Sequence, residues 1–346
     1  MWFLNSMYSF IPLLYRSIFE NTSLYGGIMD IAFPTELDLK SSLEFCKLLD
    51  YYDISNPITI DFKDMNRIEP FGMLLIGSKI RNENSVFDVK NYEYKTYAMT
   101  MGLFQSMRMD IGKHPSALGG NRNYIPIRKI DIGKSYRDAL DSSMDIYDYL
   151  EKYVADKIVD VLSRGLTSEF TKWLSYSIIE VLRNVYDHSK SKELWYAGQY
   201  WRQEDLVEIA ILDEGIGISK SLKWNKRLLI NDDSEALRLA VSPGISRKIA
   251  SKSSDIYNNE GLGLYMLKSL CEKTGDFVIC SGSKCLYATD NKVELFDTSF
   301  NGTIIRIRIK PSKFIGISNL IQKFSIEAEE KKKSYKGLKE ISVDII

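Results

Sequence analysis

The sequence carries no excess of charge, because 46 lysines and arginines balance 46 aspartates and glutamates over 346 residues. A formal net charge of zero predicts no general electrostatic attraction to nucleic acid or to an anionic membrane surface. Apolar residues make up 45% of the chain, enough for two domains that each have a core of their own. We therefore expect a two-domain protein that binds neither nucleic acid nor membrane.

Cysteine is scarce, and the four cysteines have neither the paired spacing of a metal site nor the density of a disulfide scaffold. We expect reduced thiols in a cytoplasmic protein. The cysteines are Cys46, Cys271, Cys280 and Cys285.

Long hydrophobic runs are also lacking. The apolar run from Met7 to Phe19 is interrupted by Arg16 and is far shorter than the roughly 20 residues that span a bilayer. The start of the chain has no basic segment and no small-residue cleavage site of a signal peptide. Residues 1–29 are predicted to be an N-terminal extension, either a packing helix or a segment upstream of a start at Met29.

Residues 176–188 carry the most informative pattern. Apolar side chains recur at three- and four-residue intervals, which predicts an amphipathic helix with one face in a core. Glu180 and Asn184 are one turn apart and His188 is one further turn on, so their side chains share a face. The pattern predicts a polar site on a rigid helix. The apolar residues are Phe170, Trp173, Leu174, Ile178, Val181, Leu182 and Val185.

Two glycine-centred stretches follow this helix. The apolar run 206–212 predicts a strand that leads directly into the first stretch, and a helical pattern follows the second. Glycines at the start of a helix expose amide groups, and the helix dipole favours an anion such as phosphate there. The residues concerned are Asp213, Gly215 and Gly217 in the first stretch and Gly261, Leu262 and Gly263 in the second.

The order of these motifs resembles the GHKL superfamily of ATP-binding domains, also called the Bergerat fold, shared by DNA gyrase B, MutL, histidine kinases and anti-sigma-factor kinases. One motif alone is weak evidence, but four in family order over roughly 130 residues are hard to obtain by chance. The matching positions are Glu180, Asn184, Asp187 and His188 (N box), Asp213, Gly215 and Gly217 (first glycine box), Gly261, Leu262 and Gly263 (second glycine box), and Thr303 after Gly302.

The resemblance implies ATP and Mg²⁺ as cofactors. Asn184 would be the Mg²⁺ ligand, and Asp213 would accept a hydrogen bond from the adenine amino group. Glu180 would be the general base on an attacking water, with a structural carboxylate as the alternative. The first pair of glycines would let the backbone approach the nucleotide, and the second pair would present amides to the phosphates.

Other roles stay open at this point. Thr303 reaches the nucleotide base or merely begins a strand, and His188 orients a group near the phosphates or is a structural histidine. The polar stretch 220–259 resembles the family's ATP lid. The only other histidine is His114, in a Gly- and Pro-rich stretch that suits no exposed helical phosphoacceptor, so a self-contained histidine kinase is not expected. Candidate phosphate partners in the lid are Lys220, Arg247, Lys248 and Lys252.

The N-terminal half has an α/β pattern, with a helix predicted over 39–52, a strand over 58–62 and a helix over 71–80. The last two elements resemble the centre of a STAS domain, the fold of anti-sigma-factor antagonists. That family carries a serine or threonine just before the glycine, whereas Phe71 precedes Gly72 here. Phenylalanine has no hydroxyl, so phosphorylation there is excluded and an interaction or packing module is expected.

The expected fold is α/β (α+β) with two domains: an N-terminal STAS-like α/β domain and a C-terminal GHKL α/β sandwich with a mixed sheet and helices on one face. The boundaries are 30–125 for the STAS-like domain, 126–165 for a helical linker, 166–312 for the ATP-binding domain and 313–346 for a C-terminal helix or tail.

The resemblance implies a Mg-ATP-dependent conformational switch with slow hydrolysis, in bacterial signalling or stress response. A protein partner would bind through the STAS-like domain or the lid. Both a monomer and a homodimer stay open. The alternatives are a Ser/Thr protein kinase of the anti-sigma-factor type and an ATP-binding scaffold that does not hydrolyse.

Overall fold

The computed structural model describes residues 23–25, 28–51, 57–112, 123–246, 261–290, 292–335 and 338–345. Most of the predicted N-terminal extension lies outside these residues, as does the stretch that contains His114. The part of the predicted lid that holds Arg247, Lys248 and Lys252 also lies outside them. Within the described ranges, no helix is both long and apolar enough to cross a membrane.

The N-terminal unit is built on a small sheet with the strand order β1-β2-β4-β6. In β4, Ile58 and Ile60 are buried while Thr59 and Asp61 are partly exposed, so one face of the sheet lies in the core. Strands β2 (Ile28–Ala32), β4 (Ile58–Asp61) and β6 (Phe87–Lys90) are parallel, β1 (Ser23–Tyr25) is antiparallel to β2, and β3 (Glu36–Leu37) pairs separately with β5 (Arg67–Ile68).

Four helices share one hydrophobic cluster with this sheet. The predicted helices over 39–52 and 71–80 and the predicted strand over 58–62 are confirmed. Nearly every residue of the second helix is buried, which explains why its sequence is apolar on all sides. The helices are α3 (Leu39–Tyr51), α4 (Pro70–Asn82), α5 (Thr96–Met101) and α6 (Leu103–Ser106).

The C-terminal unit is built on a five-stranded sheet with the order β10-β11-β9-β8-β7. All four pairings between its strands are antiparallel, which corrects the mixed sheet expected for this unit. Strands β8 and β9 form an antiparallel hairpin that residues 202–205 connect. The strands are β7 (Tyr124–Asp131), β8 (Glu193–Trp201), β9 (Leu206–Asp213), β10 (Gly275–Thr289) and β11 (Lys292–Ile309).

Residues 126–165, predicted as a helical linker, belong to the C-terminal unit instead. They begin inside β7 and continue as helices whose apolar residues, among them Leu150 and Ile158, share a core with Phe170 and Ile209. These helices are α7 (Ile132–Asp141), α8 (Ile146–Leu150), the π-helical segment η3 (Glu151–Ala155) and α9 (Asp156–Leu162).

Three of the remaining helices of the C-terminal unit carry or directly follow the predicted motifs: α10 (Ser168–Asn184) carries the first half of the N box, and α11 (Gly217–Leu222) and α13 (Gly263–Thr274) begin at the two glycine boxes. The predicted core helix is α10, which continues as a π-helical turn, η4 (Val185–Ser189). The other helices are α12 (Asp233–Ala240) and α14 (Ser318–Ser334), with short 3₁₀ turns η5 (Arg202–Glu204), η6 (Pro311–Lys313) and η7 (Val343–Ile345).

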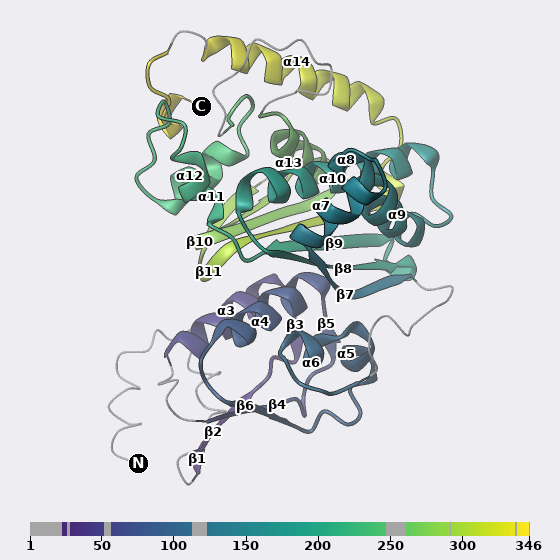
Figure 1. The fold of residues 1–346 in the computed structure, drawn as a ribbon, viewed down its shortest axis with the longest axis vertical. Coiled ribbons are helices and arrows are strands. Elements are labelled where there is room, and N and C mark those ends of the chain that lie inside the picture. Colours follow the sequence, from purple (N-terminus) through teal and green to yellow (C-terminus); the bar gives the residue numbers. More distant parts are fainter. Residues whose placement is uncertain are drawn as a thin grey trace.

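The molecule is layered (Figure 1). From the bottom of the view, the N-terminal sheet is followed by α3 and α4, then by the C-terminal sheet, then by α7–α10 and α13, with α14 outermost. Helices were expected on one face of the C-terminal sheet, and α10 and α13 do pack there. Its second face is covered by α4, whose core also includes Leu212 and Ile304 of the sheet. The C-terminal sheet is therefore buried on both faces.

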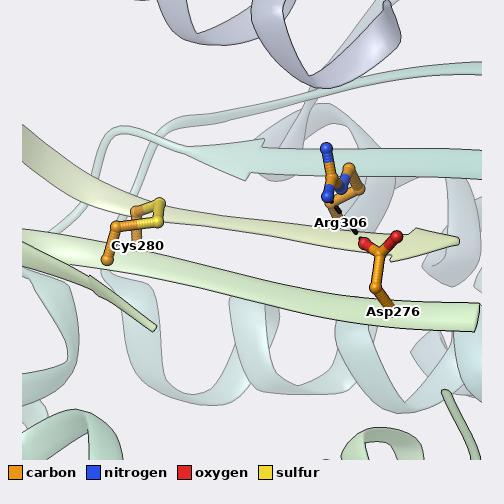
Figure 2. Close-up of a disulfide and its surroundings, with 4 residues drawn as sticks. Asp276, Cys280 and Arg306 are labelled. Atoms are coloured by element: carbon orange, nitrogen blue, oxygen red, sulfur yellow. Dashed lines mark hydrogen bonds and ion pairs between the residues drawn. A yellow bond between two sulfur atoms is a disulfide. The ribbon is translucent and has the colours of Figure 1, made fainter. Parts of the chain in front are cut away.

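Arginines alternate with isoleucines at the end of β11, and the two arginines face the N-terminal unit. Arg306 is only 2% exposed and donates to Asp276 at 2.6 Å. Figure 2 shows the two side chains pointing toward each other. Arg308 forms ion pairs with Glu69 of the N-terminal unit and with Glu208 of β9. Each arginine thus has a buried carboxylate partner, as charges inside a protein require.

Two of the cysteines form a disulfide, which corrects the expectation of four reduced thiols. Cys280 and Cys285 of β10 are joined (Figure 2). In a regular strand these residues would be about 17 Å apart. A register irregularity around Gly282 turns the chain between them, so that their Cα atoms are 3.9 Å apart. Cys46 and Cys271 are free and buried.

The C-terminal segment, predicted as a helix or tail, contains helix α14, and beyond this helix it packs against the predicted lid. Tyr335 and Ile341 are buried in a cluster with Leu228 and Leu239. Arg227 donates to the carbonyl oxygens of residues 335 and 338, both at 2.8 Å. The lid itself is partly helical, since α12 buries its apolar face.

Candidate functional site

A cavity of about 500 Å³ opens between α10, the end of β9 and the start of α13. Its volume lies within the range of small-molecule sites in proteins. The cavity brings together most of the residues that the sequence singled out, from positions more than 120 apart in the chain. The predicted residues that line it are Glu180, Asn184, Asp187, His188, Asp213, Gly217, Gly261, Gly263 and Thr303.

The helix α10 and its π-helical turn position the first group. Thr167 caps the helix by accepting from the backbone N–H of Phe170 at 3.3 Å. Near the other end, the Asn184 side-chain amide donates to the Glu180 carbonyl at 2.9 Å, so its Oδ1 remains an acceptor. The π-helical turn that follows adds a residue to the last turn and carries Asp187 to the cavity.

Glu180 lies against the start of α13. A Cβ atom at Gly263 would be 2.1 Å from Glu180 Oε2, so any side chain at this position would require the carboxylate to move. Burial raises the pKa of Glu180; Arg183, at 3.7 Å, opposes the shift and Asp187 adds to it. A carboxylate whose pKa is moved toward neutrality is suited to accept a proton.

Asp213 ends β9 in the middle of the sheet. It is paired with Leu194 on one side and with Thr303 on the other, and it is 3% exposed. Burial raises its pKa to about 7, although its Oδ1 accepts from the Gly215 N–H at 2.9 Å. A buried acceptor at the floor of a cavity can recognise one polar group of a ligand.

The first glycine box is a tight turn, and other segments of the chain pack closely against Gly215 and Gly217. A Cβ atom at Gly215 would be 2.1 Å from the Ser189 carbonyl oxygen, and Gly217 has a φ of +76°. Gly215 does not line the cavity, so its expected approach to a ligand is replaced by contact with η4. Leu262 likewise lies in the core, 5% exposed.

Comparison with known protein families found no family model that matches the chain, and comparison with curated proteins found no matching relative.

Three residues at the site were not found from the sequence. Ser281 of β10 accepts from the Ile218 N–H at 3.0 Å and donates to the Gly302 carbonyl at 2.6 Å, which ties the first glycine box to β11. Tyr147 donates to Asp187, and Arg183 lies 5.0 Å from the centroid of the Tyr147 ring. Isolated serine, tyrosine and arginine residues have no sequence signal, because their role arises from tertiary contacts.

The described part of the lid forms the remaining wall. Leu222, Ala240 and Ile245 line the cavity, next to Ile218 at the start of α11. The Gly244 N–H donates to the Gly261 carbonyl at 2.8 Å, so the lid region meets the second glycine box. Lys220 does not line the cavity. In the part of the chain that the structure describes, no group of three or more His, Cys, Asp or Glu residues is arranged to hold a metal ion.

Proposed function

We propose that the protein binds Mg-ATP through a GHKL-type site and acts as an ATP-dependent conformational switch with slow hydrolysis. One observation carries the proposal: residues from each of four separate family motifs line a single cavity. The chance that unrelated residues spread over 120 positions would meet in this way is small.

The residues present fit a nucleotide and its metal ion. Asp213 is a buried acceptor, as recognition of an amino group requires, and it is beside Thr303. At the other side of the cavity, Asn184 Oδ1 is an oxygen ligand of the kind that Mg²⁺ takes when phosphates supply further ligands. The first turn of α13 offers backbone amides where phosphates would lie.

Glu180 would accept the proton of the attacking water. Its partial burial and raised pKa support this role, and Gly263 leaves its carboxylate the room that it needs. Bound Mg²⁺ would supply charge neutralisation on the phosphates. The described part of the lid, residues 220–246, would exclude water through its apolar wall.

Transfer of the phosphoryl group to a partner protein remains the second candidate. The same Glu180 would then act on a hydroxyl instead of on water. Phe71 is fully buried against the C-terminal sheet and has no hydroxyl, so a substrate hydroxyl at the STAS position would have to come from another chain.

The test measures ATP binding and phosphate release by the full chain in the presence of Mg²⁺. We expect Glu180→Gln to retain ATP and to lower phosphate release by about 10²- to 10⁴-fold. Glu169→Gln, in the first turn of the same helix, is the matched control and should release phosphate at the normal rate.

The outcomes separate the candidates. Phosphate release that Glu180→Gln abolishes supports the switch. ATP binding without release, together with label transferred to an added protein, supports the kinase, and binding with neither reaction supports a scaffold. If the unaltered protein binds no ATP, the proposed function is wrong.

A further inference from the structure

Glu214 lies in the first glycine box but points away from the cavity. Side chains alternate along β9, so Ile211 packs in the core under α10 whereas Leu212 packs in the core of the N-terminal unit. Asp213 is on the same face as Ile211 and lines the cavity. Glu214 is on the same face as Leu212, and its carboxylate contacts helix α4. The two neighbouring acidic residues therefore act on opposite faces of the sheet.

Three side chains of α4 hold the Glu214 carboxylate, all at the same oxygen. The Arg81 guanidinium is buried, and it also donates to the Ser106 carbonyl at 2.8 Å and lies 4.0 Å from the centroid of the Trp195 ring. An arginine fixed by two other groups holds its carboxylate partner in one position. The donors to Glu214 Oε1 are Ser78 Oγ at 2.6 Å, Asn82 Nδ2 at 2.8 Å and Arg81 Nη2.

The strand β9 holds α4 near its other end as well. Glu208 Oε1 accepts from the backbone N–H of Phe71, in the first turn of the helix, at 3.0 Å. From Phe71 to Arg81 a helix rises by about 15 Å, and from Glu208 to Glu214 a strand rises by about 20 Å. The similar lengths let α4 lie along β9 with a carboxylate contact at each end.

We propose that Glu214 couples nucleotide binding to docking of the N-terminal unit, an inference that rests on the ATP-binding function proposed above. Glu214 is held by α4, and the backbone N–H of Ile216 donates to the Ser189 carbonyl at 2.8 Å, so the backbone that follows Asp213 is fixed. Glu214 and Arg81 are positioning residues, because they act on the ligand through Asp213. By reciprocity, bound nucleotide stabilises the docked N-terminal unit by the same factor.

The test compares two glutamates that each contact an arginine of the N-terminal unit. Glu204 is the matched control, because it accepts from Arg67 at 3.0 and 2.8 Å but lies before the start of β9, away from Asp213. Equilibrium binding of ATP to the full chain should be weakened about 5- to 30-fold by Glu214→Gln and less than about twofold by Glu204→Gln. Gln keeps the size of the side chain, and thermal unfolding confirms that each variant is folded.

A second readout follows the coupling itself. Because Arg81 lies over Trp195, ATP binding should change the fluorescence of Trp195, and Trp195→Phe should remove that change. Arg81→Lys should retain more ATP affinity than Arg81→Met, since lysine keeps a cation beside Glu214.

If the unaltered protein binds ATP and Asp213→Ala does not, but Glu214→Gln binds as tightly as Glu204→Gln, the coupling is overturned and the proposed function stands. If Trp195 fluorescence stays constant while ATP binds, the coupling is also overturned. If the unaltered protein does not bind ATP at all, both proposals fail.

Discussion

The two faces of the C-terminal sheet both bury carboxylates, yet they differ in the cations that accompany them. Toward the N-terminal unit, Glu208 is fully buried, and burial would raise its pKa, but Arg308 and Arg306 beside it hold that pKa below its usual value. The pKa of Glu69, which shares Arg308 with Glu208, is raised by burial and by the Glu208 charge. Toward the helical layer, Asp213 and Glu180 have raised pKa values because of burial, without a full set of cationic partners.

The difference shows which face is structural and which is suited to bind a ligand. Buried charges that are paired add to the fit between the two units. Buried carboxylates with raised pKa values, gathered at a cavity, are typical of functional sites. Alternation along β9 assigns one role to Glu208 and Glu214 and the other to Asp213, within seven residues of chain.

The paired face should be the more sensitive to loss of a charge. Arg308→Met would leave Glu69 and Glu208 buried beside each other without their main partner, so the free energy of unfolding should fall by about 3–5 kcal/mol. Glu180→Gln on the cavity side should change it by less than about 1 kcal/mol. Denaturant unfolding measures both, and equal losses in the two variants would contradict the distinction.

The cavity face should show the opposite pH dependence from that of a paired carboxylate. The pKa of Asp213 is about 7 in the folded state against an ordinary 3.8, so the folded protein keeps a proton that the unfolded chain releases. Stability due to this group is therefore lost as the pH rises from about 4 to 7, and the loss is complete above pH 7.

Asp213→Asn removes this titration and keeps the acceptor for the Gly215 N–H. At pH 8 the variant should exceed the unaltered protein in stability by about 2–4 kcal/mol more than it does at pH 4. Unfolding in denaturant at the two pH values measures the difference. A difference that does not vary with pH would show that Asp213 does not titrate in this way.

The glycine beside Glu180 offers a sharper test of the cavity. In Gly263→Ala the new Cβ would meet Glu180 Oε2, so the carboxylate must move, and we expect a loss of about 1–3 kcal/mol in stability together with slower phosphate release. Gly133→Ala is the control, because its Cβ would have only ordinary contacts at 3.4 Å or more in helix α7. The control should gain about 0.5 kcal/mol. If both variants behave alike, the close packing at Gly263 has no functional importance.

The sequence was sufficient where a local pattern sets the structure. Apolar spacing predicted α10, and the position of Asp213 after an apolar run predicted a strand that ends at the cavity. Glycines marked the turn at Gly217 because a positive φ favours that residue.

The sequence was insufficient where contacts between residues distant in the chain determine the structure. The alternation of isoleucine and arginine over 303–309 is typical of a strand with one exposed face, and only docking of the N-terminal unit buries Arg306. The spacing of Cys280 and Cys285 argues against a bond until the irregularity at Gly282 is known. Glu214 has no pattern of its own, since its partners are more than 130 positions away.

Loss of the contact between the C-terminal segment and the lid region should have the smallest effect. This change tests the wall of the cavity that the lid forms rather than its floor at Asp213. Arg227 donates to backbone carbonyls of residues 335 and 338 and is partly exposed, so Arg227→Met should lower stability by only about 1 kcal/mol. Because this contact holds the segment that continues into Ile245, ATP affinity should fall by about two- to fivefold. Arg238→Met, in the last turn of α12, is the control and should bind ATP normally. Unchanged affinity in Arg227→Met would mean that the C-terminal segment stabilises the fold without affecting the site.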